Sequence, residues 1–162
     1  MSGPADGTVE ERLAELGYTL PPAMAPITKY RWATRDGNVI YLAGHGPFLD
    51  GKPTHVGKVG KELTVDEAYE ANRFVGLTML RTLKEEIGSL DLIEAPLFHV
   101  NYVNVAPGVG DTYILVANGS TDLWISLWGE EIGCCARMTV GVAELPCSVP
   151  TAITSTWRVR GT

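Results

Sequence analysis

The stretch from residue 64 to residue 87 constrains the fold most, because it predicts one long helix with a single apolar face. It opens with Thr64-Val65-Asp66-Glu67, in which a threonine precedes a glutamate by three residues, the pattern of a capping box. Gly88 favours the end of the helix. The apolar residues that recur every three or four positions are Ala68, Ala71, Val75, Met79, Leu83 and Ile87. Such a helix is stable only where a second layer covers its apolar face.

Strand patterns supply that second layer. Residues 27–34 and 38–45 flank Asp36-Gly37, which favours a tight hairpin turn. A further strand is expected at about residues 97–105, and a last one at residues 151–159. The order of helices and strands along the chain therefore predicts helices laid against a largely β-sheet layer.

The strand at about residues 97–105 follows Pro96, which indicates a strand start or a sheet edge. Its alternation places Phe98, Val100 and Tyr102 on one face. If the helices lie on the other face of the sheet, this face has to be buried elsewhere.

Two further helices are expected. Residues 8–11 form a capping box and predict a short helix over about residues 9–16, followed by a proline-rich connector up to residue 26. Ser120 is expected to cap a second long helix that runs to about Glu131. The fold class predicted is α+β, a mixed β-sheet with two long helices on one face and a short N-terminal helix.

The length of 162 residues fits one domain, with residues 1–26 as its N-terminal helix and connector. The net charge of −6 and the lack of a basic block argue against a nucleic-acid partner. No apolar run is long enough to cross a membrane, and residues 1–7 do not resemble a signal peptide, so we expect a cytoplasmic protein.

The three cysteines, Cys134, Cys135 and Cys147, fit free thiols better than a disulfide framework. They and the scattered histidines lack zinc-ligand spacing, so no metal site is expected. Tryptophans 124, 128 and 157 belong either to the core or to a self-association surface.

The strand predicted within residues 135–146 has alternating apolar residues that indicate a buried strand, with Arg137 near its start. A guanidinium is a planar, permanently charged fork that suits a carboxylate. Arg137 therefore either pairs with an acidic side chain of the protein or binds a carboxylate ligand.

Four stretches together resemble the YjgF/RidA family over about residues 9–159, in particular a longer subgroup with an extra N-terminal helix. They are residues 12–17 (RLAELG), 57–60 (GKVG), 118–123 (NGSTDL) and 136–146 (ARMTVGVAELP). The resemblance implies the chorismate-mutase-like fold and a homotrimer with clefts between subunits. It also implies hydrolysis of a carboxylate-bearing imine or enamine to a keto acid and ammonia, without a cofactor.

By matching position, the resemblance implies that Arg137 holds the substrate carboxylate. It also implies that four further residues contact the substrate, Gly44 and Thr139 through their backbone groups: Tyr30, Gly44, Asn118 and Thr139. His45 stands where the family usually has a glutamine, and we regard it as a candidate for proton transfer or as an inert strand-end histidine.

Two positions depart from the family. The glutamates of the last strand, one of which positions the attacking water in deaminating members, are replaced here by Ala152 and Thr154. Cys135 as a nucleophile, and Asp122 or Glu144 as a replacement acid, are weaker candidates.

The remaining polar residues on strands are expected to serve packing rather than chemistry. His99 points away from the face of Phe98 and is expected in the core or on the surface. Tyr41, like Tyr30, could donate a hydrogen bond to a ligand, but tyrosines in strands commonly serve packing alone.

The leading hypothesis is a small hydrolase or tautomerase of the RidA type, in which Arg137 binds the substrate and His45 moves a proton. The alternative is a non-catalytic trimer that binds a small carboxylate or an interaction partner, which the loss of the glutamate at position 152 favours. The acidic charge balance argues against a ribonuclease.

Overall fold

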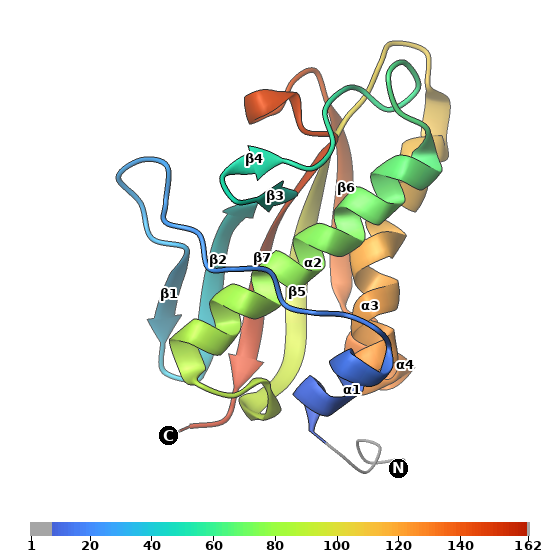
Figure 1. Cartoon of the computed structure of the whole chain (residues 1–162). Coiled ribbons are helices and arrows are strands. Elements are labelled where there is room, and N and C mark those ends of the chain that lie inside the picture. Colours follow the sequence, from blue (N-terminus) through green and yellow to red (C-terminus); the bar gives the residue numbers. More distant parts are fainter. Residues whose placement is uncertain (1–7, 162) are drawn as a thin grey trace.

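The computed structural model describes residues 8–161, which form one sheet with helices against one face (Figure 1). The helices are α1 (Val9–Glu15), α2 (Val65–Ile87), α3 (Asn118–Trp128) and α4 (Glu130–Gly133), with 3-10 turns at Leu90–Leu92, Gly110–Ala117 and Pro146–Ser148. The strands are β1 (Ala33–Asp36), β2 (Val39–His45), β3 (Phe48–Leu49), β4 (Lys52–Pro53), β5 (Ile93–Asn104), β6 (Ala136–Val142) and β7 (Thr151–Val159).

The main sheet has five strands in the order β1-β2-β7-β5-β6, while β3 and β4 form a separate hairpin. The first four strands pair antiparallel, and β6 joins the edge parallel to β5. The sheet is therefore mixed, and the predicted α+β class and arrangement are confirmed.

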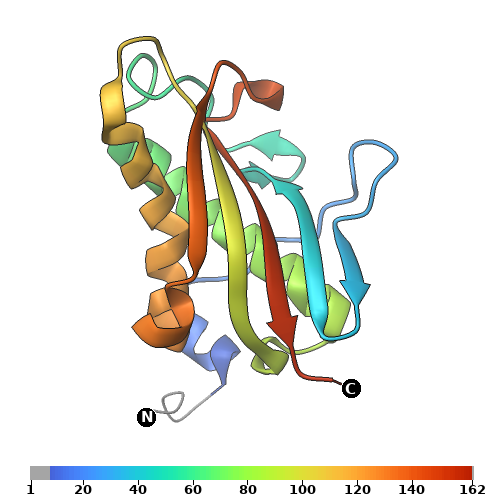
Figure 2. The same ribbon diagram turned by 180° about the vertical axis from the view of Figure 1, so that it is seen from behind.

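The helices α2 and α3 cover one face of this sheet, and the opposite face is bare (Figure 2). The core lies between the layers and is built from the apolar stripe of α2, the inner residues of α3 and the inward side chains of β2 and β7. On the bare face, Tyr41, Phe98 and Met138 are 50%, 43% and 55% exposed. Exposed apolar side chains gathered on one face are typical of an interaction surface.

The predicted long helix is confirmed at both ends. Thr64 and Glu67 form the capping box, and Gly88 ends the helix at a positive φ of 85°. The last strand is confirmed with the predicted bounds, Thr151–Val159.

The first strand is shorter than predicted, because only Ala33–Asp36 pairs with β2. Residues 27–31 leave the sheet, whereas the Trp32 carbonyl still accepts from the Ala43 amide of β2 at 2.9 Å. The Tyr30 amide donates to the Thr28 carbonyl in a tight turn, and the Trp32 indole donates to the Met24 carbonyl at 2.7 Å. These contacts are local or point back along the connector, and they replace the predicted pairing.

The prediction that Pro96 marks a strand start or an edge was wrong. β5 begins at Ile93 and is an interior strand, and Pro96 lies at an irregularity in its pairing with β7. A bulge tolerates a residue without an amide hydrogen, so the proline fits within the strand.

The second helix also differs from its prediction. α3 begins at Asn118, and Ser120 is inside it, where its hydroxyl donates to the Ala117 carbonyl at 3.3 Å instead of capping the helix. Gly129, with φ of 81°, then ends α3 before the short α4. β6, predicted as buried, is an edge strand with mostly exposed side chains in the single chain.

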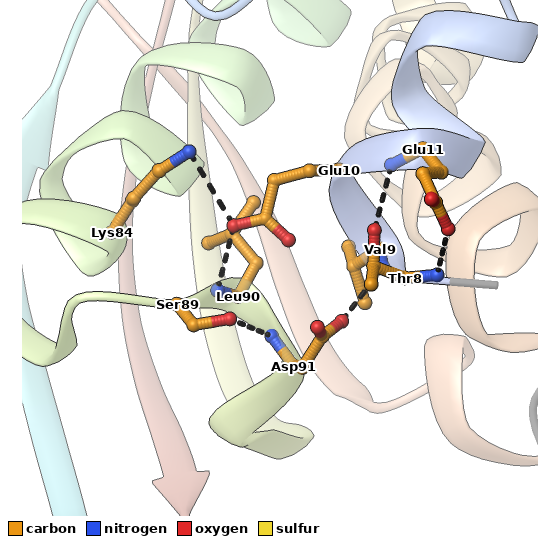
Figure 3. Close-up of polar contacts among 8 residues, drawn as sticks. All are labelled: Thr8, Val9, Glu10, Glu11, Lys84, Ser89, Leu90 and Asp91. Atoms are coloured by element: carbon orange, nitrogen blue, oxygen red, sulfur yellow. Dashed lines mark hydrogen bonds and ion pairs between the residues drawn. The ribbon is translucent and has the colours of Figure 1, made fainter.

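The predicted N-terminal helix is confirmed, and it is fastened to the connection between α2 and β5 (Figure 3). The Asp91 carboxylate accepts from the Val9 amide at 2.7 Å, and the Glu10 carboxylate accepts from the Leu90 amide at 3.1 Å. Lys84 of α2 lies 3.5 Å from the same Glu10 carboxylate. The helix α1 and the 3-10 turn Leu90–Leu92 thus each provide a carboxylate that accepts a hydrogen bond from the first backbone amide of the other.

The N-terminal segment then runs across the outer side of α2 before it reaches β1 (Figure 1). None of the helices within residues 8–161 has the length and apolar character of a membrane span. The prediction about a signal peptide concerns residues 1–7, which lie outside the described residues.

Candidate functional site

Arg137 lies near the start of the edge strand β6, opposite His99 of β5, on the face of the sheet that carries the helices. Its guanidinium reaches the first turn of α3, where Nη1 donates to Thr121 Oγ1 at 2.8 Å and Nη2 donates to Asn118 Oδ1 at 2.7 Å. Asn118 and Thr121 are three residues apart on a helix, so their side chains lie on the same face.

Both partners of Arg137 are neutral. Within residues 8–161 no carboxylate lies within ion-pair distance of its guanidinium. The structure thus fixes the orientation of the guanidinium without neutralising its charge, which is what a carboxylate-binding arginine requires.

The position of α3 depends on a buried asparagine of α2. Asn72, fully buried, accepts from the Ser120 amide through Oδ1 at 2.9 Å. Its amide nitrogen donates to Asn101 of β5 at 2.9 Å and to Thr151 of β7 at 3.0 Å. No side chain of α3 caps its own start. Asn72 therefore supplies that cap from the neighbouring helix and joins it to the sheet.

Gly119 lets the two helices approach closely enough for this bond. A Cβ at this position would lie 2.1 Å from the Tyr69 carbonyl oxygen and 2.8 Å from the Arg73 amide nitrogen, both backbone atoms of α2. Any side chain would push the start of α3 away from α2, and Asn118 and Thr121 would move with it.

His45 lies at the end of β2, beneath α2, and is only 4% exposed. Nδ1 bonds the Ala43 carbonyl at 2.7 Å, Nε2 bonds Thr82 Oγ1 at 2.8 Å, and the ring packs against Trp32. Two strands separate β2 from β6, so His45 and Arg137 of one chain are at least roughly 14 Å apart. Another subunit could only cover His45 further, because it is already enclosed within its own chain.

Burial lowers the pKa of His45 from 6.5 to about 4, against the opposing effect of its bond to the Ala43 carbonyl. Between pH 6.5 and pH 4, His45 stays neutral in the folded protein but takes up a proton in the unfolded chain. Its contribution to stability is therefore complete above pH 6.5 and is lost as the pH falls towards 4. When the pH is lowered from 7 to 5, the free energy of unfolding measured with urea should fall, and the part of this fall that is due to His45 should be about 2 kcal/mol.

His45→Gln should remove that part of the pH dependence. His99 should contribute a similar part, because burial and the charge of Arg137 lower its pKa to about 3. The partly exposed His55 provides the matched control, since His55→Gln should keep the slope of wild type. An unchanged slope in His45→Gln would contradict the prediction.

The other predicted substrate contacts are spread across the sheet. Tyr30, 38% exposed, precedes β1 at the opposite edge from Arg137, and its ring packs edge-on against Trp32. Gly44 is exposed near the end of β2, and Thr139 shares the helix-side face with Arg137. Of the four residues predicted to contact the substrate with Arg137, one chain brings only Asn118 into contact with it.

Cys135 and His99 adjoin Arg137 but are poorly suited to chemistry. Cys135 Sγ lies 4.0 Å from His99 Nδ1, and burial raises the pKa of this thiol to about 11. His99 is 1% exposed and packs on Trp124, so of the two predicted places, core or surface, the structure shows the core. A thiol with so high a pKa is a weak nucleophile at neutral pH.

The candidate acids are elsewhere as well. Asp122 accepts a hydrogen bond of 2.6 Å from the Tyr69 hydroxyl, and Glu144 follows the far end of β6. Ala152 and Thr154 lie opposite Tyr102 and Val100, on the bare face of the sheet.

Thr121 is the residue of this site that the sequence interpretation missed. The sequence signal for Thr121 is its three-residue spacing from Asn118 in the motif at residues 118–123. Within residues 8–161, no group of three histidine, cysteine, aspartate or glutamate side chains is arranged to hold a metal ion.

Known proteins similar to this chain place it in a family. A Trypanosoma cruzi protein, TCP17, is 36% identical over 90% of this chain and 91% of its own length. The Agrobacterium tumefaciens protein Atu1372, described as of unknown function, is 31% identical over 94% of this chain and 92% of its own, with a TM-score of 0.85. RidA from a Psychrobacter species shares the fold at 19% identity, with a TM-score of 0.59 over 85% of this chain and 94% of its own.

The chain belongs to the YjgF/RidA family. No protein-family model matches it. Membership confirms the resemblance carried by residues 12–17, 57–60, 118–123 and 136–146, and with it the fold, whereas activity and substrate are separate questions.

Proposed function

We propose that this YjgF/RidA protein binds a small carboxylate-bearing molecule at Arg137. The observation that carries the proposal is a guanidinium held by two neutral acceptors, Thr121 and Asn118, with no carboxylate partner among residues 8–161. Arginine in such a setting offers a preoriented positive charge and further N–H donors to a ligand.

We further propose a homotrimer with the ligand sites between subunits. The bare, apolar sheet face supports self-association, and Tyr30 can adjoin Arg137 only if it comes from another copy, because the two lie at opposite edges of the sheet. Sedimentation equilibrium should give a mass of three 17.5 kDa chains, and a single-chain mass would contradict the trimer.

Deaminating hydrolysis of an imine or enamine is the second candidate function, and family membership supports it. In this reaction water adds to the imine carbon and the C–N bond breaks, which gives a keto acid and ammonia. Two observations weigh against it: Ala152 stands at the family's glutamate position, and His45 is enclosed beneath α2. We therefore rank carboxylate binding first.

Titration with pyruvate by isothermal calorimetry tests the first candidate. We expect saturable binding of pyruvate and none of acetone, which has the same carbonyl but no carboxylate. Absence of binding by pyruvate and by larger 2-oxo acids would contradict the proposal.

The release of ammonia and pyruvate from freshly generated 2-iminopropionate separates the two candidates. Binding without catalysis predicts the same rate with and without the protein. An accelerated rate that Arg137→Ala abolishes would establish the hydrolase instead, and His45→Gln would then keep that rate, because His45 is not accessible to the substrate.

A further inference from the structure

A cavity of about 330 Å³ lies beyond the far end of β6. Arg137 lies opposite His99 of β5, whereas Val142, at the end of β6, lies opposite Asn104. The five residue steps from Arg137 to Val142 correspond to roughly 16 Å along the strand, so this cavity is separate from the Arg137 site. Its charged lining residues are Lys58, Glu62 and Glu144.

Lys58 presents an ammonium group without a counter-charge. Nζ donates to Asn104 Oδ1 at 2.7 Å and to the Ala143 carbonyl, which leaves the third N–H free. Asn104 is itself buried, and its amide nitrogen donates to the Val149 carbonyl at 3.3 Å, so the lysine head is held by a fixed partner. No carboxylate within residues 8–161 forms an ion pair with Lys58.

Glu144 presents the opposite charge to the same cavity. Its carboxylate is exposed and has neither a hydrogen bond nor an ion pair with any residue from 8 to 161. Glu62 is already engaged, because its two oxygens contact Lys61 Nζ at 2.8 Å and the Lys58 amide at 2.9 Å. Lys58 and Glu144 thus face one cavity while remaining more than ion-pair distance apart.

The wall between these charges is held in a specific backbone conformation. Cys147 and Ser148 have φ of 56° and 54°, in the left-handed region, and the Ser148 carbonyl accepts from the Gly57 amide at 2.8 Å. Two consecutive non-glycine residues in this region are energetically unfavourable, by about 1 to 3 kcal/mol each. The geometry of the cavity is therefore set by the fold.

We propose that this cavity binds a zwitterionic α-amino acid, with the ligand carboxylate on Lys58 and the ligand ammonium on Glu144. The cavity offers one uncommitted cation and one uncommitted anion, so a ligand that carries both charges neutralises both groups. A simple carboxylate would gain an ion pair with Lys58 alone, and a simple amine would gain one with Glu144 alone. This inference does not depend on the function proposed for Arg137.

The test is an NMR titration of the isotope-labelled full chain with L-alanine. Saturable shifts are expected for the amides of Gly57, Lys58 and Ser148. Isobutyrate has a methyl group in place of the ammonium of L-alanine, and isopropylamine has a methyl group in place of its carboxylate, so each keeps one charge; both should bind at least about tenfold more weakly. Equal binding of isobutyrate would overturn the amino-acid assignment, and no saturable shift at millimolar L-alanine would overturn the site.

The decisive variant is Glu144→Gln, because this exposed side chain makes no described contact and its loss should leave the fold intact. Glu144→Gln and Lys58→Met should each weaken L-alanine binding at least about tenfold, while Lys52→Met, at an exposed lysine of β4 that does not line the cavity, should not. Arg137→Ala should keep L-alanine binding. Loss of binding in Arg137→Ala, with none in Glu144→Gln, would place the amino acid at the other site and overturn the proposal.

Discussion

Replacing Arg137 by alanine is expected to weaken pyruvate binding between about 10-fold and 100-fold, without unfolding the protein. A hydrogen bond to a charged group contributes about 1.5 to 3 kcal/mol, and about 1.4 kcal/mol corresponds to a tenfold change in affinity. The fold should persist, because the hydrogen bonds of the guanidinium within residues 8–161 go to two side chains of α3 alone, and Thr121 keeps its own bond to the Ala117 carbonyl.

The measurement is calorimetric titration with pyruvate, and two variants sharpen it. Arg137→Lys keeps the charge but loses the planar fork that spans Asn118 and Thr121, so its affinity should fall between those of wild type and Arg137→Ala. Arg158→Ala is the matched control, since Arg158 is an exposed arginine of β7 that pairs with Glu94 of β5. Wild-type affinity in Arg137→Ala would rule out this arginine as the binding group.

Thr121 adds a test of how the arginine is held. Thr121→Val keeps the volume of the side chain but removes the acceptor of Nη1, so the guanidinium is fixed by Asn118 alone. Part of the loss seen in Arg137→Ala should therefore appear in this variant. Thr121 and Asn118 both lie on α3, so the orientation of the guanidinium depends on this helix and not only on the strand that carries Arg137.

The sequence predicted the elements whose signals are local. The capping boxes at Thr8 and Thr64, the turn at Asp36-Gly37 and the apolar stripe of α2 each depend on residues within a few positions, and all were confirmed. The start of α3 was not predicted correctly, because its cap is Asn72, which is distant in sequence and can be recognised only when α2 and α3 lie side by side.

Two residues of the candidate site could be predicted from the sequence, but the surroundings of His45 could not. Arg137 and Asn118 followed from the family resemblance, and the structure brings them into contact at 2.7 Å. The enclosure of His45 could not be predicted, since it results from the way α2 and the N-terminal connector cover the end of β2. Pro22 and Met24 of that connector line the small cavity beside His45. Nothing in the sequence around His45 indicates that residues distant along the chain bury its side chain.

Asn72→Ala should lower the free energy of unfolding by about 3 kcal/mol or more, the largest stability effect that we expect from a single substitution here. The change removes three hydrogen bonds in a fully buried position and leaves the Ser120 amide, Asn101 and Thr151 without this partner. Each buried polar group left unsatisfied costs about 1 to 3 kcal/mol. Urea unfolding of the variant and wild type measures the difference.

Two comparisons show whether this loss comes from the network. Glu70→Ala, an exposed position on α2 paired only with Arg73, should change stability by less than about 1 kcal/mol. Asn72→Asp keeps an acceptor for the Ser120 amide but loses both donors and buries a charge, so it should destabilise the protein at least as much as alanine. A small effect in both Asn72 variants would mean that α3 is held mainly by apolar packing. If the network is what positions α3, then Asn72→Ala should also weaken pyruvate binding under folding conditions, because Asn118 and Thr121 lie on the turn that it fixes.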